Sequence, residues 1–200
     1  MSDQQETMIP VLIDVQDTPN PQVRKFALGF PVTGAGEPIE LSNFAQAREV
    51  SDLAADLFDF PETENVFLGK DFISVMVRSG TSWEGFSPVV LSTISHYLSQ
   101  KKPLIKTEAL AKISTDEAEI RPEDQEIVTK IKEIIEHRVR PAVARDGGDI
   151  LFRSYQDGIV YLVLKGACAG CPSAQATLKD GVERLLQHFI PEVKEVRQAV

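Results

Sequence analysis

A polar segment at residues 101–121 divides this 200-residue chain into two regions, and it limits the fold more than any other feature of the sequence. The segment reads KKPLIKTEALAKISTDEAEIR, and its apolar residues are only weakly periodic. The regions on either side each show their own strand and helix patterns. We therefore expect two small α+β domains, at residues 10–102 and 122–200, joined by a flexible linker at residues 103–121.

The first region combines strand signals with helical periodicity. The corner Thr18-Pro19-Asn20-Pro21 is rigid because two prolines fix φ and remove two backbone donors. Its expected elements are, in chain order, strands at residues 11–15 and 23–28, a helix that begins after Ser42 or Asn43 and ends before Pro61, a hairpin of strands at residues 65–68 and 72–77, and a helix over residues 87–100.

The second region is expected to place a hairpin between two amphipathic helices. Asp157-Gly158 separates two β-rich runs and tolerates the positive φ of a tight turn. The Gly147-Gly148 pair is interpreted as a helix-to-strand turn without a ligand role. The expected elements are a helix over residues 123–139, strands at residues 149–156 and 159–165, a helix over residues 173–189 and a short strand at residues 193–196.

Charge and hydropathy narrow the class of protein. The net charge of −9 argues against nucleic acid as a partner, because phosphate binding needs a basic surface. Most of the negative charge lies in residues 1–103, which contain 7 Lys and Arg against 14 Asp and Glu. Such a charge excess either favours basic partners or serves only to keep the protein soluble. No apolar run approaches the ~18 residues that cross a bilayer, and residues 1–8 lack signal-peptide character. We expect a cytoplasmic protein, or an organellar matrix protein if the chain is a processed form.

Two cysteines, Cys168 and Cys171, carry the candidate chemistry. They lie in Gly166-Ala-Cys-Ala-Gly-Cys-Pro-Ser173, between the second strand of the hairpin and the following helix. A helix N-terminus favours thiolate over thiol, and small residues allow a bulky group to approach the sulfurs. With only two residues between them, the cysteines cannot form a disulfide framework for the fold.

The spacing alone leaves the ligand open, since zinc, iron–sulfur clusters and disulfide exchange all use Cys-x-x-Cys. A tetrahedral zinc or a cubane cluster usually takes four protein ligands, and this domain offers two thiolates. His188 would lie roughly 25 Å from Cys171 along a helix, so it cannot complete the same site. Two chains face to face would supply four thiolates around one labile cluster.

The two regions together resemble a known family. The run from Arg140 to Asp149, RPAVARDGGD, followed by the cysteine segment, resembles the C-terminal domain of NifU and of Nfu-type iron–sulfur carriers. Thr18-Pro19-Asn20-Pro21 with Lys25-Phe26, and Val66-Phe67, are similar to the N-terminal domain of Nfu proteins. The resemblance covers residues 10–200, while the additional cysteines of full-length NifU are absent.

This resemblance implies a scaffold or carrier rather than an enzyme. It implies a [4Fe–4S] cluster bound by Cys168 and Cys171 and shared between two subunits in a cluster-dependent homodimer. Upstream cluster-assembly proteins and recipient apo-proteins are the implied partners. The main alternative is a thiol–disulfide oxidoreductase, although residues 122–200 offer too few strands for the thioredoxin sheet, and a structural zinc module is the second alternative.

Overall fold

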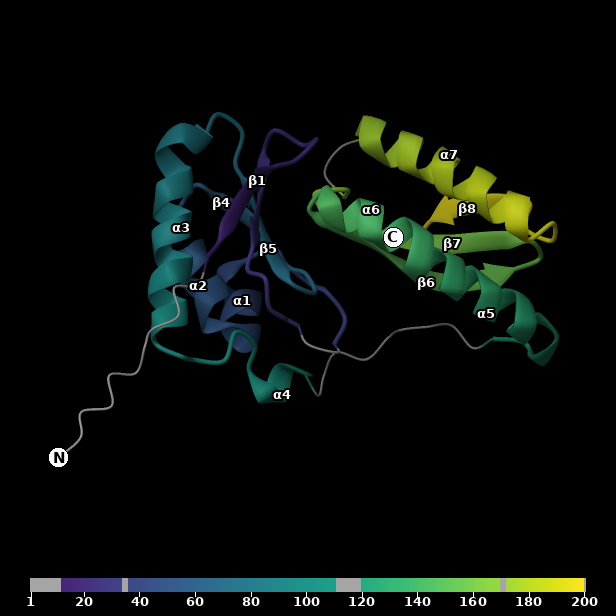
Figure 1. The fold of residues 1–200 in the computed structure, drawn as a ribbon, viewed down its shortest axis with the longest axis horizontal. Coiled ribbons are helices and arrows are strands. Elements are labelled where there is room, and N and C mark those ends of the chain that lie inside the picture. The colour runs from purple at the N-terminus through teal and green to yellow at the C-terminus, as the bar shows by residue number, and fades with distance from the viewer. Residues whose placement is uncertain (1–11, 34–35, 111–119, 170–171, 200) are drawn as a thin grey trace.

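The computed structural model describes residues 12–33, 36–110, 120–169 and 172–199 of the chain. They form two α+β domains that follow one another along the sequence, which confirms the expected fold class (Figure 1). Each domain has its own sheet and its own cluster of buried apolar side chains.

The N-terminal domain contains a five-stranded antiparallel sheet with strand order β1-β2-β5-β4-β3. The predicted hairpin is formed by the two central strands β4 and β5, with Val66 opposite Val75. The three-residue strand β3 was not predicted, because so short a run carries no usable periodicity. The strands are β1 (Asp14–Asp17), β2 (Val23–Ala27), β3 (Ile39–Leu41), β4 (Thr63–Leu68) and β5 (Phe72–Val77).

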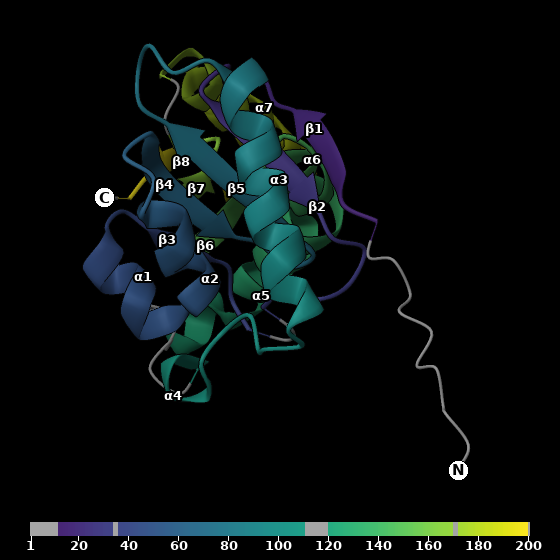
Figure 2. The same ribbon diagram turned by 90° about the vertical axis from the view of Figure 1, so that its left-hand side faces the viewer.

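Helices cover the face of this sheet that points away from the other domain (Figure 2). The single helix predicted before Pro61 is wrong, because Ser51 adopts an extended conformation and ends one helix. The Ser51 hydroxyl oxygen then caps the next helix by accepting from Ala54 N at 3.2 Å. The helices are α1 (Phe44–Val50), α2 (Asp52–Phe58), α3 (Trp83–Ser99), which starts before the predicted residue 87, and α4 (Thr107–Leu110).

The first part of the segment expected as a linker packs on the N-terminal domain. Leu104, Ile105 and Ala109 are buried members of that domain's apolar cluster. Lys106 donates its backbone N–H to Val50 O at 2.8 Å and forms an ion pair with Asp52. Residues 111–119 lie outside the described residues, so the boundaries at 103 and 121 stay a prediction.

The C-terminal domain contains a three-stranded sheet, in which β6 and β7 are antiparallel and β7 and β8 are parallel. The predicted tight turn joins β6 and β7, since Asp157 and Gly158 both have positive φ. Its helices pack on one face of the sheet around Ile131, Leu162 and Leu186. The elements are α5 (Gln125–Ile134), α6 (Arg140–Arg145), β6 (Gly148–Gln156), β7 (Ile159–Gly166), α7 (Pro172–Phe189) and β8 (Glu195–Gln198).

The helix predicted over residues 123–139 is divided in the structure. A 3₁₀ turn at Pro122–Asp124 precedes α5, and a π turn at Ile135–Val139 joins α5 to α6. Pro141 has no N–H to continue the α-helical bonds, and the N–H of Arg140 instead reaches Ile135 O. Among the residues that the structure describes, no helix combines the length and apolar character needed to cross a bilayer.

Candidate functional site

The cysteine loop, residues 166–171, connects the end of β7 to the start of α7. Gly166 turns the chain with φ of +66°, and the N–H of Ala169 donates to Gly166 O at 3.0 Å. The side chain of Cys168 is 8% exposed and packs with the apolar cluster of the C-terminal domain. Cys171, the second expected ligand, lies outside the described residues, so its geometry relative to Cys168 stays a prediction.

The glycine pair between α6 and β6 supports the cysteine loop. Gly147 has φ of +79°, and its carbonyl accepts the N–H of Ala167 at 3.2 Å. A Cβ at Gly148 would lie 2.7 Å from Lys165 O and 2.8 Å from Cys168 Sγ. The pair therefore forms the expected turn, but it also leaves the space in which the Cys168 thiol lies, a role that the sequence analysis missed.

A buried ion pair fixes this turn against the preceding helix. Asp149 is buried at the start of β6, and the Arg140 guanidinium binds its carboxylate through Nε at 2.8 Å and Nη2 at 2.6 Å. The Asp149 carboxylate also accepts the N–H of Ile150. The hydrogen bonds to Asp149 raise the pKa of Arg140, and they hold α6 and β6 together beside Cys168.

The Cys168 thiol is protonated in this environment. Burial raises its pKa to about 11, and the nearby Asp146 and Asp149 carboxylates add to the effect. This is the opposite of the direction expected from the helix N-terminus alone, because the burial of the thiol and the two carboxylates arise only from the fold. A metal that binds here must displace a proton from sulfur.

The described side chains around Cys168 do not by themselves form a metal site. In the described ranges, no group of three or more His, Cys, Asp and Glu side chains is arranged to hold a metal ion. Cys168 therefore needs ligands from Cys171, from another chain or from outside the protein.

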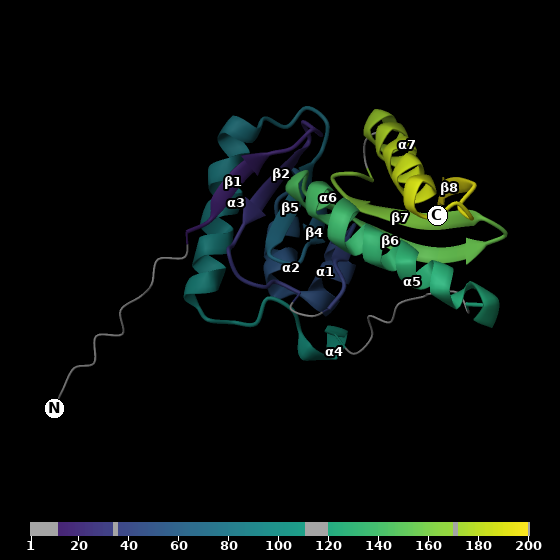
Figure 3. The same ribbon diagram turned by 45° about the vertical axis from the view of Figure 1, so that its right-hand side comes forward.

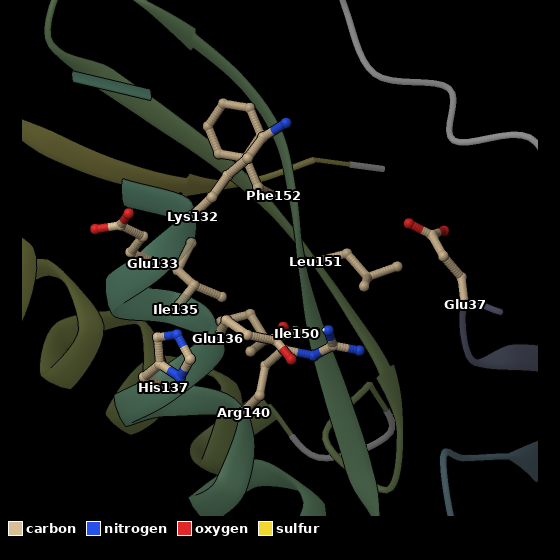
Figure 4. A pocket seen from close by; sticks show the side chains of 10 residues that line it. All are labelled: Glu37, Lys132, Glu133, Ile135, Glu136, His137, Arg140, Ile150, Leu151 and Phe152. Carbon is tan, nitrogen blue, oxygen red and sulfur yellow. Dashed lines mark hydrogen bonds and ion pairs between the residues drawn. The ribbon is translucent and has the colours of Figure 1, made fainter. Parts of the chain in front are cut away.

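A separate cavity of about 340 Å³ lies beside α5 and β6 and does not include Cys168 (Figure 4). Two of its cationic side chains are already engaged, since Arg140 binds Asp149 and Glu136, and the Lys132 ammonium lies 5.4 Å from the centre of the Phe152 ring. We assign it no ligand. Its lining residues are Glu37, Lys132, Glu133, Ile135, Glu136, His137, Arg140, Ile150, Leu151 and Phe152.

Both domains match described protein families. Residues 13–101 match the family "Scaffold protein Nfu/NifU N terminal", and residues 131–197 match the family "NifU-like domain". The two matches occur in the order that the sequence resemblance predicts. The fold and the cysteine loop thus belong to a class of protein that joins an Nfu N-terminal domain to a NifU-like domain.

Curated relatives match almost the whole length of this chain. "NFU1 iron-sulfur cluster scaffold homolog, mitochondrial" from Drosophila sechellia is 39% identical over 188 residues, which cover 94% of this chain and 65% of the relative. The protein of that name from Drosophila willistoni is 40% identical, with 94% and 63% covered. Residues 13–101 and 131–197 thus belong to the Nfu N-terminal and NifU-like domain families, and the chain spans about 65% of the length of these relatives.

A solved structure is also similar to part of the chain. It is a NifU-like protein from Saccharomyces cerevisiae, with 19% sequence identity and a TM-score of 0.46. The match covers 54% of this chain and 94% of the yeast protein.

Proposed function

We propose that this protein is an iron–sulfur cluster scaffold and carrier, and that it binds a [4Fe–4S] cluster through Cys168 and Cys171. The observation that carries the proposal is the cysteine loop at the junction of β7 and α7 in a domain that matches the NifU-like family. The names of the Drosophila relatives, which describe iron–sulfur cluster scaffolds, support it. No catalytic step is part of the proposal.

The cluster is proposed to be shared by two subunits. A cubane cluster usually takes four thiolates, and the whole sequence contains two cysteines. Two chains would supply the full set, and loss of one chain would expose half of the coordination positions. Such a cluster is labile, which suits transfer to recipient apo-proteins. The upstream partners that load the cluster and the recipients that accept it belong to the same proposal.

Disulfide exchange is the weaker alternative. An attacking cysteine reacts as a thiolate, and oxidoreductases of this kind lower the pKa of that thiol. Burial and two carboxylates raise the pKa of Cys168 to about 11. This thiol is a poor nucleophile at neutral pH, whereas a bound metal can still displace its proton.

Replacement of either cysteine by serine tests the ligand assignment. We expect Cys168→Ser and Cys171→Ser each to abolish retention of the cluster after anaerobic reconstitution with iron and sulfide, and to abolish cluster-dependent dimerisation. Absorbance and light scattering measure the two effects, and Ser92→Ala on the exposed side of α3 is the control. Circular dichroism should show an intact apo fold. Cysteine variants that keep the cluster, or that unfold, would contradict the assignment.

For the cellular compartment, we propose the one that the names of the relatives give, which differs from the cytoplasm expected from the sequence. The sequence analysis expected the cytoplasm, with an organellar matrix as the alternative. The relatives are named as mitochondrial proteins, so we propose the matrix for this chain too. Fractionation of cells that express the tagged chain tests this, and a purely cytosolic signal would contradict it.

A further inference from the structure

The N-terminal sheet is buried on both faces, although its own helices cover only one of them. The outward face of β2, β4 and β5 carries Lys25, Phe67, Phe72 and Ser74. Their exposed fractions are 8%, 1%, 2% and 2%, yet none of the four belongs to either domain's apolar cluster. Two phenylalanine rings, a lysine and a serine are therefore buried by something other than the domain's own core.

The C-terminal domain covers this outward face. The Lys25 ammonium donates to Ala144 O at 2.8 Å, and the Ser74 hydroxyl donates to Gly147 O at 2.9 Å. On β3, the Glu40 carboxylate accepts the N–H of Gly166 at 3.4 Å. In each contact a side chain of the first domain meets a main-chain atom of the second. Ala144 lies in the last turn of α6, Gly147 lies in the glycine turn, and Gly166 is the first residue of the cysteine loop. Figure 3 shows α6 beside β2 and β5 of the N-terminal sheet.

The same contacts continue to Cys168. The carbonyl of Gly147 accepts both the Ser74 hydroxyl and the N–H of Ala167, the neighbour of Cys168. The Phe67 ring lies so close to Gly166 that a Cβ there would be 2.9 Å from its Cδ1 atom. The base of the cysteine loop is therefore held between β6 of its own domain and the sheet of the other.

A cluster shared by two subunits needs this loop for a different contact. The loop of one chain must face the loop of the other across the cluster, with a whole second subunit behind it. The N-terminal sheet lies against Gly166 at the base of the same loop, so we infer that the two arrangements compete for one surface. Interfaces between domains of this kind resemble transient protein–protein contacts and separate readily. Burial of Lys25, which lowers the pKa of its ammonium, adds a reason for separation.

We propose that the outward face of the N-terminal sheet is a reversible cover for residues 166–169, the base of the cysteine loop of its own chain, so that domain docking and cluster sharing exclude each other. The inference rests on the proposed function, because it assumes a cluster held between two subunits. The two equilibria are then linked. If docking lowers the affinity for the cluster by a given factor, cluster binding lowers the docking equilibrium by the same factor.

The labelling of Lys25 by an acetylating reagent measures docking without any use of the cysteines. Lys25 is buried at the interface, whereas Lys102 is exposed on the same domain and serves as an internal reference. In the full-length apo protein we expect Lys25 to be labelled about tenfold more slowly than Lys102, as a mainly docked population requires. Anaerobic loading with iron and sulfide should raise Lys25 labelling toward the reference.

Two variants of the full chain separate the domains by different means. Ser74→Arg places a long side chain where the hydroxyl meets Gly147, and Glu40→Lys removes an acceptor and places a second cation near Lys165. We expect both to expose Lys25 in the apo protein and to load cluster up to about tenfold faster. Ser92→Arg, on the exposed side of α3, is the matched control and should behave as the wild type.

The outcomes distinguish this inference from the proposed function. If the wild type loads cluster and dimerises while Lys25 stays protected, the cover does not need to open and the inference is wrong. The inference is equally wrong if the two variants expose Lys25 but load at the wild-type rate. If no variant and no wild type takes up cluster, the proposed function itself fails, and the inference fails with it.

Discussion

The two sheets of this protein differ in how many of their faces are buried. Strand β7 alternates between buried and half-buried residues along its length, so the C-terminal sheet is covered on one face. Strand β5 is buried at five of its six positions, Ser74 included. The difference shows that the N-terminal sheet is completed by the neighbouring domain, and that its outward face serves contact between domains.

The largest expected effect concerns the inner face of β5. Ile73 is fully buried in the N-terminal core, and Ile73→Ala should lower the free energy of unfolding by about 2–5 kcal/mol because it leaves a cavity. Val163 lies at a half-buried position of β7, and Val163→Ala should cost less than about 1 kcal/mol. Denaturant unfolding of both variants measures the difference. Equal losses would mean that Ile73 and Val163 are buried alike.

A smaller effect is expected where the glycine turn meets the cysteine loop. Gly148→Ala would place a methyl group within 2.8 Å of Cys168 Sγ and Lys165 O, so the loop must shift. We expect a loss of about 1–3 kcal/mol in stability, as for other overpacked sites, and slower cluster loading. Calorimetry and reconstitution measure the two effects. Gly181→Ala is the control, because nothing lies within 4 Å of a Cβ at that position. Normal stability and loading in Gly148→Ala would show that the close contact has no role.

The smallest effect is a pH dependence of the contact between the sheets. Burial raises the pKa of Glu40, while the Gly166 N–H, Lys165 and Asn65 partly oppose the effect. The docked form therefore holds the proton more firmly than the undocked form. Docking is strongest below the ordinary carboxyl pKa of 4.5 and weakens as the pH rises through the raised value.

Small-angle scattering from about pH 4 to about pH 7 checks this prediction, because separated domains increase the radius of gyration. The wild type should expand as the pH rises. Glu40→Gln should lose most of this dependence, since its amide does not ionise. If the radius of gyration of the wild type and of Glu40→Gln changes equally with pH, groups other than Glu40 cause the expansion.

The sequence was sufficient for elements whose signals are local. The Asp157-Gly158 turn, the two strands that it joins and the helix after the cysteine loop all lie where the pattern predicts. The break at Ser51 was missed because a continuous apolar stripe runs across it and hides the change of direction. Pro141 indicated that the helix is disturbed nearby, but the sequence did not show that the disturbance is a π turn.

The environment of the site depended on contacts between distant residues. Cys168 could be chosen as a candidate from its spacing to Cys171 and its place before a helix. Its raised pKa could not be predicted, since Asp146 and Asp149 reach it only through the fold. The alternation of apolar and polar residues in the strand places Ser74 on the outward side of the hairpin. Nothing in the sequence near Ser74 shows that it is buried against Gly147, 73 residues away.

The parallel pairing of β8 with β7 has a consequence for how the cysteine loop behaves. The loop opens a crossover that leaves β7, passes through α7 and returns to the same sheet in β8. Both ends of the crossover are anchored by strand pairing, since Gly166 pairs with Gly148 of β6 and Glu195 pairs with Ile159 of β7. A ligand that binds to or leaves the cysteine loop therefore requires movement of only the few residues of that loop. The strands on either side keep their pairing.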